Sequence, residues 1–208
     1  ADLVGPRLDR PVPLGGYRWH YLDAISDDGR WVVVVIALIG SPFSPGYAAA
    51  RRRGPADPLG FAALNVALYG PHGRLWCLTD RALAPTDLEP TAVALGGSRV
   101  GWEGGALVVD VDERTAPFGG FFGRPVRGRV TVHPTSSPLP ATALDDAGEH
   151  VWWPVAPRAR VEVALREPDV RFAGDGYHDA NAGSEPLEAA FRRWTWSRAH
   201  TPEGRSLL

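Results

Sequence analysis

An acidic residue among aromatic residues is the strongest chemical signal in this sequence. Asp179 lies in the segment GYHDAN at 176–181, and the aromatic segment HVWWP at 150–154 precedes it. A carboxyl group enclosed by aromatic rings loses its hydration, which raises its pKa and lets it stay protonated near neutral pH. Such a group can act as a general acid. Residue types alone equally allow Asp179 to cap a turn onto the backbone amides near Asn181 and Gly183.

Two pairs of tryptophans flank this acid in the sequence. Trp152 and Trp153 precede it, and Trp194 and Trp196 follow it. The faces of aromatic rings carry negative potential and stabilise a cation without reacting with it. An acid lined by such rings is suited to protonating an alkene. The eight tryptophans of the chain are otherwise expected to fill the interior of the fold as structural core.

Histidines near the acid offer further chemistry. His150 could orient the acid or accept a proton from water, although an isolated histidine is about as often a structural residue. His150, His178 and Asp179 are possible metal ligands, but their spacing matches neither a helical nor a hairpin metal site. We therefore predict no metal site.

Other catalytic signatures are missing from the chain. It contains no G-x-S-x-G, no H-E-x-x-H, no C-x-x-C and no dinucleotide-binding glycine fingerprint. All 22 basic residues are arginine, so no lysine is present for a Schiff base or a Walker-type phosphate loop. We expect no cofactor. The formal charge of -2 gives no overall attraction to nucleic acid, so we expect no nucleic-acid partner.

The sequence gives no sign of an export signal or a membrane-spanning segment. Acids, arginines and prolines occupy the first 16 residues, where a signal peptide needs a continuous apolar stretch. The longest apolar run, at 31–39, is far too short for a membrane-spanning helix. We therefore expect a cytoplasmic protein. The arginines at 51–53, with Phe43 and Tyr47, could touch a membrane surface, although a solvated loop is the commoner reason for such a run.

Short strands separated by turns are predicted along most of the chain. Residues 17–24 alternate with a period of two, the SDDG turn at 26–29 follows, and 31–39 would be the hairpin partner. Further strands are predicted at 62–69, 74–79, 98–102, 106–111, 126–133, 151–155, 160–166 and 170–173. This pattern is typical of an all-β antiparallel barrel or sandwich. One short helix is predicted at 187–193, capped by Ser184, and alternation resumes at 194–197.

Several ordered segments, spread over essentially the whole chain, carry a resemblance to a known family. They are PLGGYRWHYLDAISDDGRW at 13–31, SPFSPGYAAARRRG at 41–54, AALNVALYG at 62–70, HVWWPVAPRARVEV at 150–163, and GYHDANAGSEPLEAAFRRWTWSR at 176–198. Together they resemble the carotenoid 1,2-hydratase family, the CrtC-type hydroxyneurosporene synthases. The resemblance implies a lipocalin-like all-β fold. It also implies cofactor-independent, acid-catalysed addition of water to the terminal C1,C2 double bond of an acyclic carotenoid, a hydro-lyase reaction.

The resemblance also implies roles for individual residues. Asp179 matches the aspartate that the family is proposed to use as proton donor, with Tyr177 beside it. His150 and Trp152 match the family's functionally important histidine and tryptophan in H-x-W. We expect the apolar polyene or isoprenoid substrate to contact further aromatic residues: Trp153, Trp194, Trp196, Trp19 and Tyr21.

Two departures from the family pattern leave alternatives open. His20 stands where a second tryptophan is expected after Trp19, and family members are expected to continue beyond Leu208 with a second β-rich lobe. Residues 1–208 are thus predicted to form a single lipocalin-like β domain that matches the N-terminal part of a longer, two-lobed architecture. A terpene cyclase or pericyclase on the same scaffold, or a non-catalytic lipocalin-like binder of an apolar ligand, are the alternative functions.

Overall fold

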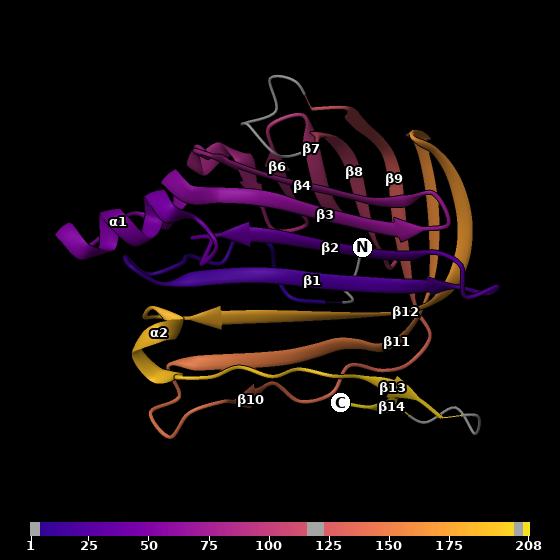
Figure 1. The fold of residues 1–208 in the computed structure, drawn as a ribbon. Coiled ribbons are helices and arrows are strands. Elements are labelled where there is room, and N and C mark those ends of the chain that lie inside the picture. Colours follow the sequence, from indigo (N-terminus) through magenta and orange to yellow (C-terminus); the bar gives the residue numbers. More distant parts are fainter. Residues whose placement is uncertain (1–4, 116–122, 202–205) are drawn as a thin grey trace.

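One antiparallel sheet that curls back over itself makes up most of the molecule (Figure 1). The computed structural model describes residues 5–115, 123–201 and 206–208. The strands of this sheet are β1 Tyr17–Ser26, β2 Val32–Ile39, β3 Ala62–Gly70, β4 Gly73–Arg81, β5 Leu88–Glu89, β6 Ala92–Leu95, β7 Ser98–Glu103, β8 Ala106–Arg114, β9 Pro125–Pro134, β10 Thr142–Ala143, β11 His150–Glu167 and β12 Asp169–Gly183. Their spatial order is β4-β3-β2-β1-β12-β11-β9-β8-β7-β6-β5, with β10 paired to β11 outside this path. The predicted all-β, lipocalin-like fold class is confirmed.

The smaller elements lie around this sheet. They are the helices α1 Pro45–Arg53 and α2 Leu187–Ala190, the 3-10 turns η1 Pro58–Phe61 and η2 Pro85–Asp87, and a two-stranded ribbon of β13 Ala199–His200 and β14 Ser206–Leu207. Residues 191–198 connect α2 to this ribbon and run beside β11 in Figure 1, and Trp196 of this segment packs on Tyr177 of β12.

The hairpins predicted from alternation and turn residues are confirmed. β1 pairs with β2, β3 with β4 and β7 with β8, each in antiparallel register. The turn between β1 and β2 is closed by Gly29 at a φ of 69°, and Gly104 and Gly105 between β7 and β8 also have positive φ. Glycine adopts this left-handed conformation at little cost, which is why these positions read as turns in the sequence.

The two strands that carry the candidate site are longer than predicted. β11 joins the separately predicted 151–155 and 160–166, and β12 extends from 169 to 183, well beyond the predicted 170–173. Irregular pairing around Ala156 absorbs the prolines of β11. Glycines in β12 mark close approach rather than a turn, because a Cβ added to Gly174 would lie 1.9 Å from the Ile25 carbonyl oxygen.

The helix predictions were partly wrong. The helix predicted at 187–193 ends at Ala190, and its expected cap Ser184 instead donates its hydroxyl to Glu149. Residues 194–197 form no strand. α1 was not predicted, although Ser44 caps it by accepting a hydrogen bond from the Tyr47 amide at 3.1 Å and proline occupies its first turn.

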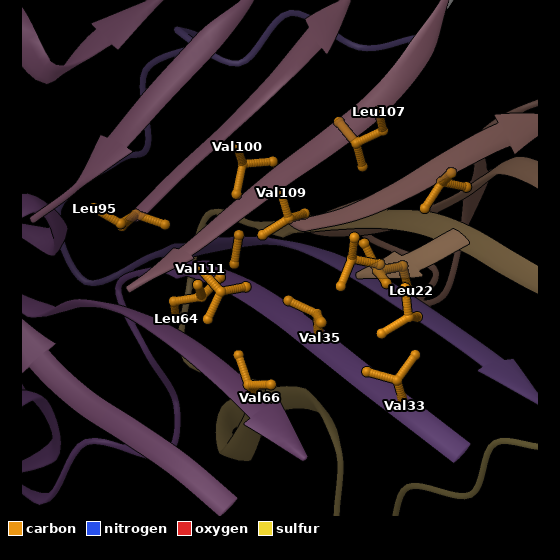
Figure 2. Packing of buried hydrophobic residues seen from close by; sticks show 14 of the residues in the cluster. Leu22, Val33, Val35, Leu64, Val66, Leu95, Val100, Leu107, Val109 and Val111 are labelled. Carbon is orange, nitrogen blue, oxygen red and sulfur yellow. The ribbon is translucent and has the colours of Figure 1, made fainter. Parts of the chain in front are cut away.

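The curled sheet encloses one hydrophobic core. Branched aliphatic side chains from its two layers meet there, as Figure 2 shows for Leu22, Val33, Val35, Leu64, Val66, Leu95, Val100, Leu107, Val109 and Val111. The expectation that tryptophans fill this interior was wrong. Trp31 and Trp102 only pack against the core while partly buried, and Trp76 is 48% exposed.

Strand alternation places the candidate acid on the face of the sheet opposite to the core. Leu22 and Ala24 of β1 belong to the core, so the intervening Tyr21 and Asp23 point to the other face. The register pairs Tyr21 with Asp179, and Asp179 therefore shares this second face. The aliphatic core and the acid thus occupy opposite sides of the same strands.

Candidate active site

Side chains of three neighbouring strands converge on the outer face. β12 lies between β1 and β11, and Asp179 pairs with Tyr21 of β1. Asn181, two residues further along β12, pairs with Trp19 on one side and Trp152 on the other. Directly opposed side chains in antiparallel strands are close neighbours, so aromatic residues of β1 and β11 flank the polar residues of β12.

Asp179 accepts three hydrogen bonds from side chains on this face. Trp152 Nε1 and the Tyr177 hydroxyl donate to Oδ2 at 3.0 and 2.9 Å, and Asn181 Nδ2 donates to Oδ1 at 2.8 Å. Asp179 is only 3% exposed. The alternative that it caps a turn is wrong, because Asp179 lies inside a strand and bonds to side chains.

Burial and hydrogen bonding act in opposite directions on the pKa of Asp179. Loss of hydration raises this pKa most strongly, whereas the hydrogen bonds from Trp152, Tyr177 and Asn181 lower it. The negative charge of Asp23 adds to the rise. Burial dominates, and the pKa of Asp179 rises from 3.8 to about 7. The group can therefore both release and recover a proton near neutral pH.

The acid faces an apolar cavity of about 620 Å³. This volume lies within the roughly 300–1,000 Å³ typical of small-molecule pockets. The residues that line it are Trp19, Tyr21, Ile36, Phe43, Leu144, Trp152, Asp179, Asn181, Phe191, Arg193, Trp194, Thr195, Trp196, Ser197 and Leu208. The structure thus brings together six predicted site residues from three distant parts of the chain: Trp19, Tyr21, Trp152, Asp179, Trp194 and Trp196.

Rings pack against one another to form the walls of this cavity. The Trp196 ring lies 5.1 Å from Tyr21 and 5.4 Å from Tyr177, measured between centroids. Phe191 and Trp194 meet edge to face at 5.5 Å. Burial raises the pKa of Tyr21 and of Tyr177, so both phenols stay neutral and can donate hydrogen bonds at neutral pH.

His150 lies behind the cavity wall instead of lining the cavity. Its Nδ1 lies 2.9 Å from the Tyr17 hydroxyl, and the Tyr17 ring stacks on Trp19 at 4.7 Å. The other side of the imidazole contacts Phe191 edge to face at 4.8 Å. His150 is fully buried and supports two of the rings that line the cavity, Trp19 and Phe191.

Trp153 and His178 point away from the acid. Trp153 pairs with Ala180, the residue after Asp179, so its side chain points to the opposite face of the sheet from Asp179. It is not among the residues that line the cavity. His178 points to the core face, where its Nε2 lies 3.1 Å from His20 Nδ1. Alternation therefore separates His178 from Asp179, and the structure contains no group of three potential metal ligands among its described residues.

Sequence reasoning missed Asn181 and Phe191 as site residues. Asn181 is 4% exposed and holds Asp179 Oδ1, and Phe191 completes the wall. Extending the alternation of β12 to its end would have identified Asn181, because Tyr177, Asp179 and Asn181 are spaced by two. Phe191 carries no such signal, since it follows α2 and reaches the cavity only through tertiary packing.

The raised pKa of Asp179 predicts how stability depends on pH. Because the unfolded carboxyl ionises near 3.8 and the folded one near 7, the contribution of Asp179 to the free energy of unfolding should fall as pH rises between these values, whereas the buried His20 and His178, whose pKa values are lowered, contribute in the opposite direction. The loss is about 1.4 kcal/mol for each unit of pKa difference. The histidines are common to both proteins, so the difference in unfolding free energy between the native chain and Asp179→Asn should fall as pH rises, as measured by urea unfolding from pH 4 to 8. A difference that stays constant with pH would show that another group is responsible.

The indole hydrogen bond predicts that only one of two adjacent tryptophans affects the pKa of Asp179. Trp152→Phe removes a donor to Asp179 and should raise the pKa of this carboxyl further, because the ionised form loses a partner. Trp153→Phe is the matched control and should leave the pKa of Asp179 unchanged. The protonated carboxyl band, assigned by its loss in Asp179→Asn, can be titrated by infrared spectroscopy. Equal shifts in both tryptophan variants would contradict the hydrogen bond as the cause.

Comparisons with known proteins identify the family of this chain. Residues 35–208 match the family model described as "Carotenoid hydratase CrtC". The acyclic carotenoid 1,2-hydratase of Thiocapsa roseopersicina is 50% identical over 204 residues, covering 98% of this chain and 49% of that protein. The enzyme of the same name from Rubrivivax gelatinosus is 46% identical over 198 residues, covering 93% and 47%. The chain spans about half the length of the curated relatives it matches.

A solved structure extends the similarity to the fold. The crystal structure of a putative AttH protein from Nitrosomonas europaea aligns with a TM-score of 0.54 at 13% identity, covering 82% of this chain and 52% of that one. At this identity the likeness concerns the fold alone. The family match over most of the sequence is the stronger finding, and it shows that this chain belongs to the carotenoid hydratase CrtC family.

Proposed function

We propose that this chain carries the acid site of a carotenoid 1,2-hydratase, a hydro-lyase that adds water across the terminal C1,C2 double bond of an acyclic carotenoid. The observation that carries the proposal is Asp179, a buried carboxyl with a pKa of about 7 in a cavity walled by aromatic rings. The relatives' names supply the substrate class. The reaction consumes one alkene and one water, so it needs no redox equivalent.

The hydrogen bonds of Asp179 indicate which oxygen delivers the proton. Trp152 Nε1 and the Tyr177 hydroxyl both donate to Oδ2 and occupy its two acceptor positions. Among the described residues Oδ1 accepts only from the Asn181 amide, so it keeps a position for the acidic proton. From Oδ1 the proton passes to C2, where the π electrons form the new C–H bond and leave a tertiary cation at C1.

Aromatic rings stabilise this cation without reacting with it. The faces of Trp19, Trp152 and Trp196 carry negative potential in a largely apolar cavity. Electrostatic stabilisation by groups already in place is usually the largest contribution to catalysis. Water then attacks C1 through an oxygen lone pair and yields a tertiary alcohol once it loses a proton.

Asp179 itself is the better candidate to recover the proton from the attacking water. After protonating C2 it is a carboxylate with a pKa near neutrality, suited to act as a base. His150 is the other candidate, but it lies behind Trp19 and Phe191 and its Nδ1 is engaged by Tyr17. We assign His150 a positioning role, in which it holds the rings of the wall.

The domain organisation is part of the same proposal. We propose that residues 1–208 form a single lipocalin-like domain equivalent to the N-terminal part of a longer, two-lobed protein. The match to 49% and 47% of the length of the two relatives supports only the part of this proposal that compares the chain with a portion of a longer protein. A second lobe would close the cavity further, since Phe43 and Trp194 on its lining are 60% and 45% exposed.

Peripheral contact with a membrane is proposed at the mouth of the cavity. Of the surface expected from the sequence, Tyr47 is fully buried and Arg51 pairs with Glu188 at 2.6 Å, so these two do not contribute. No helix among the described residues is long and apolar enough to cross a membrane. Phe43 and Trp194 instead offer exposed rings where an apolar substrate would enter.

Sedimentation with lipid vesicles tests the membrane contact. The chain should sediment with vesicles of phosphatidylcholine and phosphatidylglycerol, and Phe43→Ser with Trp194→Ser should weaken this by about tenfold or more for each residue changed, because about 1.5–3 kcal/mol is lost for each large apolar side chain withdrawn from lipid. Trp76→Ser removes an equally exposed ring outside the cavity and serves as the control. An equal loss of sedimentation in Trp76→Ser would show that Phe43 and Trp194 do not form a specific membrane-binding surface.

Incubation with neurosporene or lycopene in detergent tests the chemistry. Mass spectrometry should detect the gain of one water, and a reaction in D₂O should place one deuterium at C2. Asp179→Asn should lower turnover by roughly 10²–10⁴-fold, because the general acid is lost.

The native rate should fall as pH rises through about 7, since only protonated Asp179 is active. An isomeric product would indicate a cyclase, and an unchanged ligand would indicate a binder.

A further inference from the structure

A second buried carboxyl group lies on the same face as Asp179. Asp23 is 6% exposed and pairs in register with Tyr177, one step along the face from Asp179. Two side chains satisfy it. Arg198 Nε donates at 2.8 and 3.0 Å while its NH2 group also contacts Oδ1, and the Tyr21 hydroxyl donates to Oδ2 at 2.9 Å. Both partners of the ion pair are at least nine-tenths buried, so solvent screens it weakly.

Arg198 belongs to the segment that forms one wall of the cavity. Residues 194–197 all line the cavity, yet the segment is neither helix nor strand, and Trp194 and Trp196 remain 45% and 37% exposed. Ring packing on a half-exposed segment holds it only weakly, because little apolar area is removed from water. The ion pair at Arg198 attaches the end of this segment to β1.

The contacts of Arg198 also reach the partners of the acid. Its guanidinium carbon lies 5.9 Å from the centre of the Tyr177 ring, and Tyr177 donates to Asp179. Tyr21, held by Asp23, contacts both Trp196 and Tyr177. One ion pair therefore connects the wall of the cavity with a hydrogen-bond donor of the acid.

We propose that Asp23 and Arg198 are a positioning pair for the proposed hydration site, which fixes residues 194–197 over Asp179 and keeps the neighbouring carboxylate charge compensated. That the pair positions a hydration site rests on the proposed function. The experiments that test the pair measure a pKa and a cleavage rate, so they do not depend on that function. Neither residue lines the cavity, so the pair acts through Tyr21, Tyr177 and Trp196.

Because Arg198 compensates the charge of Asp23, replacing Arg198 and replacing Asp23 should shift the pKa of Asp179 in opposite directions. The ionisable groups that face Asp179 are Tyr21 and Asp23 from β1, Tyr177 from β12, and Arg193 and Arg198 from the C-terminal segment, while β11 contributes the non-ionisable Trp152. Asp23 raises the pKa of Asp179. Without Arg198 this effect should grow, and without the Asp23 charge it should disappear.

Two readouts that need no turnover test the pair. In Arg198→Gln, infrared titration should move the pKa of Asp179 upward by roughly half a unit or more, and in Asp23→Asn downward by a similar amount. Trypsin should cleave after Arg192 and Arg193 about tenfold or more faster in both variants, because the segment opens more often. Arg198→Lys keeps the charge without the two-pronged geometry, so it should restore the pKa but only part of the protection.

Arg160→Gln is the matched control. It breaks an exposed two-pronged pair with Asp27, which directly follows the end of β1, and should change neither readout. If Arg198→Gln does not fold, the uncharged double variant Asp23→Asn with Arg198→Gln should show the faster cleavage and the lower pKa.

The outcomes separate this inference from the proposed function. If the pKa of Asp179 shifts in the same direction in Arg198→Gln and Asp23→Asn, or if trypsin cleaves these variants no faster than Arg160→Gln, the positioning pair is overturned. This holds even if the native chain hydrates carotenoids. Opposite shifts with faster cleavage support the pair, and they do so even if the native chain leaves neurosporene unchanged, a result that would overturn the hydratase proposal alone.

Discussion

The alternation of side chains in β1, β12 and β11 determines where everything else in this molecule lies. The same three strands contribute Leu22 and Val161 to the core on one face and Tyr21 and Asp179 to the cavity on the other. Each strand therefore has two buried or half-buried faces, which is why its sequence mixes aliphatic, aromatic and polar residues. A one-residue slip in register would exchange the two sets and place the acid in the aliphatic core.

The acid is controlled by a competition between burial and hydrogen bonding. Three donors favour the ionised carboxyl, as in ordinary buried aspartates whose pKa is low. The desolvation produced by the surrounding rings outweighs them, and the balance lies near neutral pH. A carboxyl held at this balance is neither a permanent charge nor a permanently neutral group, and this is the property that reversible proton transfer to a hydrocarbon requires.

The rings of the cavity wall also hold the polar groups of the site in place. Trp196 packs on Tyr21 and Tyr177, which in turn hold Asp23 and Asp179 through their hydroxyl groups. His150 extends this arrangement through Tyr17 to Trp19 without reaching the cavity. The polar groups of the site are thus satisfied mainly by aromatic side chains, which leave the cavity apolar enough for a hydrocarbon while satisfying the hydrogen-bonding needs of the buried acids.

The sequence by itself determined the all-β class and most hairpins, because alternation and turn residues are local properties, and it singled out Asp179 as the candidate acid. It also supplied Trp152, Trp19 and Tyr21. Tertiary structure alone decided that Trp153 and His178 face away from the acid, that His150 lies behind the wall, and that Asn181 completes the carboxyl's partners. The meeting of Asp23 with Arg198 joins residues 175 positions apart, and no local pattern encodes it. Local pattern fixes which face a side chain takes within its strand, whereas the register between strands and the path of an irregular segment depend on packing across the whole fold.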